Sequence, residues 1–161
     1  MRTLVFLLCS ILFSARIQAG ELPDPAITPG AIDPEVTAAN IQESICKQKP
    51  VNWSQAHLPP ASWMEDLEKQ QIEQYHYSDT SLRHYHEDHL IPLSLGGHPT
   101  DTKNIWPQPL VAKWSARRKD YLEEVITRKV CNGEMPLAEA QDLFRTDWIA
   151  AYKKHIGDVS E

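Results

Sequence analysis

The stretch that decides the fold is DHLIPLSLGGHPTDTKN, residues 88–104. It begins with a carboxylate, Asp88, beside an imidazole, His89, and it ends at Asn104 after a turn at a glycine pair. A carboxylate is a hard oxygen ligand that suits Mg²⁺ or Mn²⁺, and an imidazole with a pKa of about 6.5 can deprotonate water near neutral pH. Hydrolysis of a phosphodiester bond needs both groups, a base for the attacking water and a cation for the charge on the phosphate.

The residues after this acid and imidazole predict a short strand–loop–strand unit. The apolar run 90–95 indicates one strand, and 104–107 indicates a second extended segment beyond the glycine-turned loop. Adjacent strand residues point to opposite faces. Asp88 and His89 can therefore share one site only if Asp88 lies in an irregular lead-in before the strand.

Most of the remaining chain has the apolar spacing and end signals of helices. The expected elements are a short helix over 35–46, a loop over 47–61, a helix over 62–75 opened by a capping box at Ser62 and Glu65, a helix from about 113 to Asn132-Gly133, and a last helix over 136–157. We therefore expect a mainly helical α+β fold, in which two short strands and a helix form a small core flanked by further helices.

Residues 1–19 have the features of a secretory signal peptide. Arg2 precedes an apolar run over 4–13, which is too short to span a bilayer, and small residues follow at a possible cleavage point. An uncleaved N-terminal anchor is the alternative. We expect an exported protein, periplasmic or secreted, with no stable membrane association after cleavage. A Pro-rich linker over 20–34 and one domain over 35–161 would follow.

The charge balance restricts how the protein can bind its partners. The chain has 16 Lys and Arg against 22 Asp and Glu, a net charge of −6. Removal of residues 1–19 would take away Arg2 and Arg16 and no acid, which leaves 14 basic and 22 acidic residues and a net charge of −8. Bulk attraction to a polyanion is therefore excluded, and binding of nucleic acid would need a locally basic cleft or a metal ion.

Two cysteines, Cys46 and Cys131, remain after the signal segment. An even number in an oxidising compartment favours a disulfide, which would close a loop of about 85 residues. Two buried free thiols are the alternative. A metal-binding pair is disfavoured because neither cysteine has a second one nearby.

The motif over 88–104 resembles that of the HNH (ββα-metal) nuclease family. The order Asp-His-x-x-Pro-Leu, Gly-Gly and Asn carries the resemblance, which extends more weakly along the chain to an exported bacterial subgroup. It implies a ββα-metal core of two short strands plus a helix. It also implies His89 as the general base, Asp88 as a metal ligand, and Asn104 as the residue whose hydrogen bonds hold the loop.

The third metal ligand of this family lies on the helix after the second strand and is usually His or Asn. The sequence departs from the family here, because no His or Asn occurs between residues 105 and 131. Asp120 and Glu124 fall one turn apart on one helical face, and Glu123 is close by. We take Asp120 as the third ligand, with a solvated surface charge as the alternative.

The dense basic cluster begins with Lys113 and continues with Arg117, Arg118 and Lys119, the three residues that we take as substrate-binding. These residues are candidates for gripping the phosphates of a substrate, and an ordinary helix surface is the alternative. A structural zinc site at His84, His86 and His89 is disfavoured, because no cysteine pairs accompany these histidines.

The resemblance implies an exported endonuclease that depends on a divalent metal and hydrolyses phosphodiester bonds with low sequence specificity. Mg²⁺ is the expected ion and Mn²⁺ an alternative, with Zn²⁺ less suited to oxygen ligands. The substrate would be DNA, RNA or both, and the sequence indicates no protein partner. Two alternatives stay open: a catalytically decayed ββα-like binding module, and a structural or interaction protein held by its disulfide.

Overall fold

The structure is a computed structural model that describes residues 20–159. Within this range the strands β1 (Tyr85–His89) and β2 (Ile105–Pro109) pair antiparallel. The longer helices are α1 (Pro50–His57), α2 (Ala61–Gln74), α3 (Ala116–Cys131) and α4 (Leu137–His155). Short helical turns lie at η1 (Gln42–Cys46), η2 (Leu82–His84), η3 (Leu93–Leu95) and η4 (Thr102–Asn104). The expectation of a mainly helical α+β fold is confirmed.

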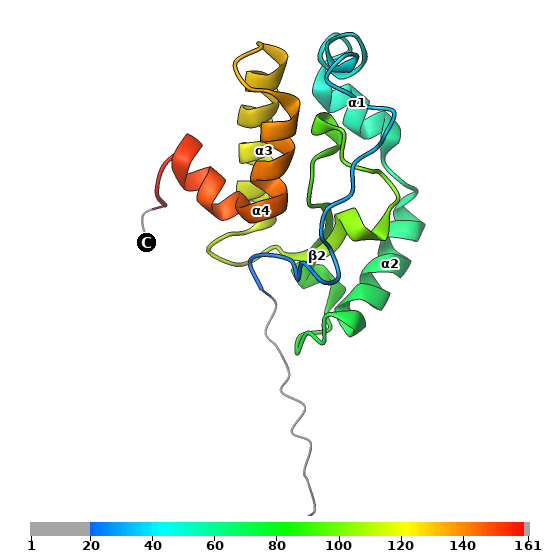
Figure 1. Ribbon diagram of the computed structural model, residues 1–161. Coiled ribbons are helices and arrows are strands. Elements are labelled where there is room, and N and C mark those ends of the chain that lie inside the picture. The colour runs from blue at the N-terminus through cyan, green and yellow to red at the C-terminus, as the bar shows by residue number, and fades with distance from the viewer. Residues whose placement is uncertain (1–19, 160–161) are drawn as a thin grey trace, which may run out of the picture.

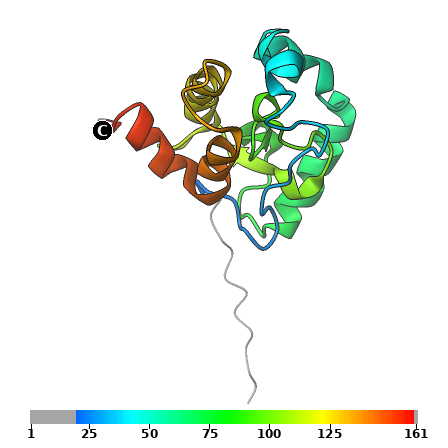
Figure 2. The same ribbon diagram turned by 45° about the horizontal axis from the view of Figure 1, so that its top comes forward.

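The strand pair occupies the middle of the molecule, with α1 and α2 on one side and α3 and α4 on the other (Figures 1 and 2). Two tryptophans without accessible surface, Trp106 on β2 and Trp148 on α4, belong to the shared core. Leu122 and Ile126 of α3 join them at helical spacing. The core therefore fixes α3 against the strand pair, which places the polar end of β1 next to this helix.

The first strand lies earlier in the sequence than expected. It covers Tyr85–His89, and the apolar run 90–95 forms a loop that ends in the turn η3. Pro92 interrupts this run, and a Cβ atom at Gly97 would lie only 1.8 Å from the carbonyl oxygen of Ile91. The backbone therefore folds back on itself here. The apolar side chains of the run are buried by loop packing, so the prediction of a strand over 90–95 was wrong.

The segment before the strands also differs from the expectation. Residues 47–61, expected to be a loop, contain the helix α1, which begins at Pro50 and buries none of its side chains. Helix α2 begins at Ala61 after Pro60, and no side chain caps it, so the predicted capping box at Ser62 and Glu65 does not form. The helix expected over 35–46 is reduced to turns and the short element η1.

Residues 20–34, expected to be a linker, contact the domain closely. The Thr28 hydroxyl donates to the carbonyl oxygen of Ile105 at 3.2 Å. The Gly30 N–H donates to the carbonyl oxygen of Lys103 at 2.8 Å. One partner, Ile105, begins β2, and the other, Lys103, lies in the turn η4 just before it. This segment therefore packs against the end of the loop that joins the strands and is part of the domain.

The predicted disulfide between Cys46 and Cys131 is confirmed, with 5.4 Å between the two Cα atoms. It joins the end of η1 to the last residue of α3. Helices α3 and α4 run close to the predicted ranges, and Gly133 has a φ of 74° just after α3, as expected for a helix end.

The described residues contain no helix that is both long enough and apolar enough to cross a membrane. The predicted signal peptide, residues 1–19, lies outside the described residues. The disulfide is compatible with an exported protein.

Candidate active site

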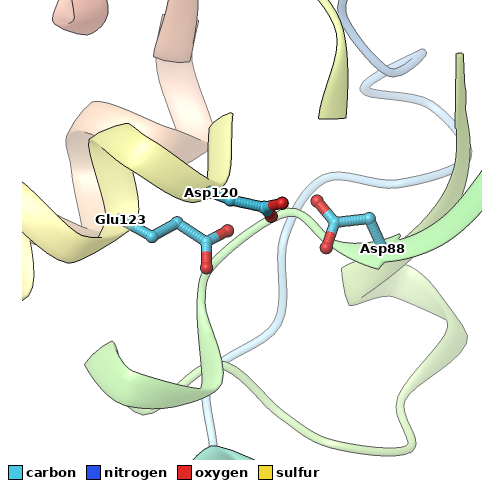
Figure 3. Close-up of side chains that lie close together, drawn as sticks. All are labelled: Asp88, Asp120 and Glu123. Carbon is cyan, nitrogen blue, oxygen red and sulfur yellow. The ribbon is translucent and has the colours of Figure 1, made fainter. Parts of the chain in front are cut away.

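Three carboxylates converge where the end of β1 meets the first turns of α3. Asp88 comes from the strand and Asp120 and Glu123 from the helix, and one oxygen of each lies within 4.8 Å of the others. Figure 3 shows the three groups pointing toward one another. Asp120 therefore lies where the sequence predicted the third ligand. Glu123 joins it because residues three apart share one helical face, whereas Glu124 pairs with Arg128 on the exposed side.

Lys119 lies against the same carboxylates and has no accessible surface. Its ammonium group donates to the carbonyl oxygen of His89 at 2.6 Å and to Glu123 Oε1. It also lies 2.8 Å from Asp88 Oδ2 in an ion pair. The expectation that Lys119 grips phosphates at the surface does not fit this burial, because its charge is already engaged inside the protein.

The basic cluster at the start of α3 is therefore divided. Arg117 is exposed, and Arg118 is half-buried with its guanidinium carbon 5.8 Å from the centre of the Trp114 ring. Of the three residues predicted to bind phosphate, only Arg117 keeps the exposure of a surface contact.

The local charges shift the pKa of each carboxyl group. Burial alone would raise the pKa of Asp88, but the Lys119 ammonium group outweighs burial and holds that pKa below its usual range. Burial raises the pKa of Asp120 and of Glu123. Although burial disfavours the charged form of Lys119, the neighbouring carboxylates raise its pKa. With all four groups ionised, three carboxylates and one ammonium carry a net charge of −2.

This donor set fits a divalent cation. Asp88 is only 8% exposed, and its Oδ2 lies 2.8 Å from the Lys119 ammonium, so one cation already compensates part of the buried negative charge. When all three carboxylates are ionised, they leave an excess of negative charge over Lys119 that a second cation would balance. All the candidate ligands are oxygens, the donors that Mg²⁺ and Mn²⁺ prefer.

His89 is the last residue of β1, and its imidazole is buried. The ring atom Nε2 lies 2.9 Å from the carbonyl oxygen of Pro99. A carbonyl can only accept, so Nε2 carries the proton and Nδ1 keeps a free lone pair. Burial lowers the pKa of His89, although the Pro99 carbonyl and the Asp88 carboxylate oppose this shift. The imidazole is therefore neutral near pH 7, the state that a proton acceptor requires.

Asp88 and His89 both lie within the regular strand and both line one cavity, as do the other three residues of β1. Because adjacent side chains of a strand alternate in direction, this shared lining does not bring the two groups together, and His89 is not among the three clustered ligands. The cavity has a volume of about 400 Å³ and lies between α2 and β1. The expected irregular lead-in before the strand is absent from β1, since Asp88 pairs with Trp106 and His89 with Ile105. A second cavity of about 510 Å³ lies between α1 and α3, and Asp120 and Glu123 line it. The carboxylates thus lie at the boundary between two open spaces.

Asn104 makes the loop-holding hydrogen bonds that were predicted for it. Its Oδ1 accepts from the N–H of Ile91 at 2.9 Å, and its Nδ2 donates to the carbonyl oxygens of Ile91 at 3.0 Å and His98 at 3.2 Å. His98 immediately precedes Pro99, whose carbonyl orients His89. The buried amide of Asn104 therefore holds the segment that fixes the tautomer of the imidazole.

The histidines considered for zinc do not converge. His84 Nδ1 lies 2.5 Å from Asp79 Oδ2, away from the three carboxylates, while His89 contacts Pro99. In the part of the chain that the structure describes, the only group of three or more clustered metal-ligating side chains is Asp88, Asp120 and Glu123.

The comparisons with known proteins add no family to this geometry. No protein-family model, no curated protein and no solved structure matches the chain. The resemblance to HNH nucleases therefore stays a prediction from residues 88–104.

Proposed function

We propose that this protein is an exported, metal-dependent endonuclease that hydrolyses phosphodiester bonds of nucleic acid with low sequence specificity. The observation that carries the proposal is the pair of groups at the end of β1. A neutral imidazole, His89, neighbours a carboxylate, Asp88, that faces two further carboxylates on α3. A base for water and a site for a cation are the two requirements of this reaction.

Asp88, Asp120 and Glu123 would hold the metal ion, for which Mg²⁺ suits the oxygen donors best and Mn²⁺ next. When bound, such an ion neutralises charge on the phosphate and on the leaving oxygen. Burial raises the pKa of Glu123 to about 8, and a bound divalent ion would favour its ionised form. With all three carboxylates ionised the cluster would carry two negative charges in excess of Lys119, which one divalent ion balances.

His89 would act as the general base through Nδ1. It accepts a proton from a water molecule, the water oxygen attacks phosphorus, and the bond to the 3′ oxygen breaks. The departing 3′ oxygen takes a proton from solvent water, and the imidazolium returns its own proton to solvent, which leaves a 5′-phosphate and a 3′-hydroxyl. The hydrogen bond from Nε2 to the Pro99 carbonyl becomes stronger as the ring gains charge, so it stabilises the imidazolium that forms. Asn104 holds this carbonyl in place through the neighbouring His98.

The net charge and the burial of Lys119 bear on how a nucleic acid would bind. The net negative charge gives no bulk attraction to a polyanion, and Lys113 and Arg117 are the exposed basic residues of the predicted cluster. Binding would therefore depend on contacts near the scissile phosphate and on the cation there, and these contacts carry no sequence information. DNA and RNA both offer such a phosphate.

Export is part of the proposal. It is supported by the signal-like sequence over 1–19 and by the disulfide, since structural disulfides persist mainly in oxidising compartments. Periplasm and medium are both compatible with these features.

The test is a plasmid-nicking assay with the purified, oxidised chain in Mg²⁺, in Mn²⁺ and in EDTA. We expect cleavage with either metal and none in EDTA. In His89→Ala we expect the cleavage rate to fall by at least about 100-fold. His84→Ala is the matched control, because His84 is exposed and contacts Asp79. Unchanged cleavage in His89→Ala or full activity in EDTA would refute the proposal. A decayed binding module would instead show no cleavage and no saturable binding of a divalent ion.

A further inference from the structure

Lys119 lies in a position that a metal ion would otherwise suit. Its ammonium nitrogen has three oxygen neighbours: the carbonyl oxygen of His89 at 2.6 Å, Asp88 Oδ2 at 2.8 Å, and Glu123 Oε1. A cradle of two carboxylates and one backbone carbonyl is the kind of oxygen set that binds divalent cations in proteins. A fully buried lysine side chain is rare unless it is paired, and the three oxygens that Lys119 contacts are all acceptors.

The same contacts decide how much charge is left for a metal. Asp88 and Glu123 contact Lys119 and also belong to the carboxylate group that includes Asp120. With the ammonium present and all three carboxylates ionised, the four groups sum to −2, which one divalent ion balances. Without it they would sum to −3, and carboxylates that bridge two ions 3.5–4 Å apart are a common arrangement in phosphodiesterases.

We propose that the Lys119 ammonium is a resident cation that fills the second cation position of this centre, so that the centre binds one divalent ion and not two. The inference rests on the proposed metal site. Lys119 acts there as a positioning residue. It holds the carboxylate of Asp88 and the backbone carbonyl of His89 in one orientation, and it contributes one fixed charge that salt and pH leave in place.

The experiment counts bound Mn²⁺ per chain by equilibrium dialysis, with free Mn²⁺ measured from its electron paramagnetic resonance signal. We expect one ion in the wild type and two in Lys119→Ala, where the oxygen cradle is open. Addition of methylammonium, which can replace the lost group, should return Lys119→Ala to one ion. Lys129→Ala is the control, since it removes the same charge about 15 Å further along α3 and should keep one ion.

A second variant keeps the inference testable if Lys119→Ala does not fold. Lys119→Met keeps the length of the side chain and fills the cradle, but it removes the positive charge. We expect one Mn²⁺ per chain, bound about tenfold more tightly or better than in the wild type, because Asp88 and Glu123 are no longer neutralised.

The outcomes separate this inference from the proposed function. A wild type that binds no Mn²⁺ would refute the metal site itself. A wild type that binds one ion and cleaves DNA, with one ion also in Lys119→Ala and unchanged or weaker binding in Lys119→Met, would overturn the role of Lys119 and leave the nuclease proposal standing.

Discussion

Glu87 gives a prediction about stability that the structure allows us to work through. It lies in β1 beside Asp88, it is 6% exposed, and neither carboxylate oxygen has a hydrogen-bond partner in the described part of the chain. Burial, followed by the charges of Glu68 and Asp88, raises its pKa from the usual 4.5 to about 9. In the folded protein Glu87 therefore keeps its proton at neutral pH.

This shift makes the folded state less stable as the pH rises. The folded protein binds the proton of Glu87 more tightly than the unfolded chain does, so the contribution to stability is fully present below pH 4.5 and is lost as the pH approaches 9. Between these values the free energy of unfolding falls by about 1.4 kcal/mol per pH unit. From pH 4.5 to pH 7 the loss is about 3 kcal/mol.

Glu87→Gln keeps the shape of the side chain and removes its titration. We expect the variant and the wild type to differ little at pH 4.5, and the variant to be more stable by about 3 kcal/mol at pH 7. Urea unfolding followed by tryptophan fluorescence, at several pH values and in EDTA, measures this difference. Glu73→Gln, an exposed position on α2, is the control. A difference that stays constant between pH 4.5 and pH 7 would refute the reasoning.

Two further predictions concern the loop and the disulfide. Asn104→Ala leaves the N–H and the carbonyl of Ile91 without their partner. We therefore expect the free energy of unfolding to fall by about 3 kcal/mol in urea, and nicking to be at least about tenfold slower. An unchanged urea midpoint would contradict this role, and the exposed substitution Asn132→Ala is the control. Reduction of the Cys46–Cys131 bond, which spans 85 residues, should lower the free energy of unfolding by about 4 kcal/mol; equal urea midpoints with and without reductant would contradict it.

The features that could be predicted from the sequence are those that depend on local chemistry. Helix α3 shows its apolar stripe at Leu122 and Ile126 and ends at a glycine. Asn104 was predicted to hold the loop, and it does so because its amide can satisfy an N–H and two carbonyls at once. The disulfide followed from the number of cysteines.

The strand and the first long helix escaped prediction for physical reasons. The spacing of apolar residues shows which side chains are buried, but not which backbone conformation buries them. The apolar run 90–95 therefore resembled a strand, although its side chains are buried by a loop. The true strand, Tyr85–His89, is rich in polar residues because its end carries the site. Helix α1 buries none of its residues, so it has no apolar stripe by which it could be recognised.

The burial of Lys119 and the approach of Glu123 depend on tertiary contacts. Lys119 was read as part of a basic surface because its neighbours Arg117 and Arg118 are also basic. The sequence contains one indication of this burial. Lys119, Leu122 and Ile126 are spaced so that they share one face of the helix, which places the Lys119 charge on the same face as the buried apolar residues. The charge is compensated by Asp88 and the His89 carbonyl oxygen opposite that face and by Glu123 one turn further along α3.

The contacts of Thr28 and Gly30 have a consequence for the order of assembly. Their backbone partners at Ile105 and Lys103 lie more than seventy positions later in the chain. A polypeptide that emerges from the ribosome or from an export channel does so from its N-terminal end, so these early residues must wait until β2 has been released. The imidazole and the carboxylates cannot reach their final geometry before that moment. The candidate site, in a protein of this topology, is therefore completed only after β2 and the first turns of α3 have been released.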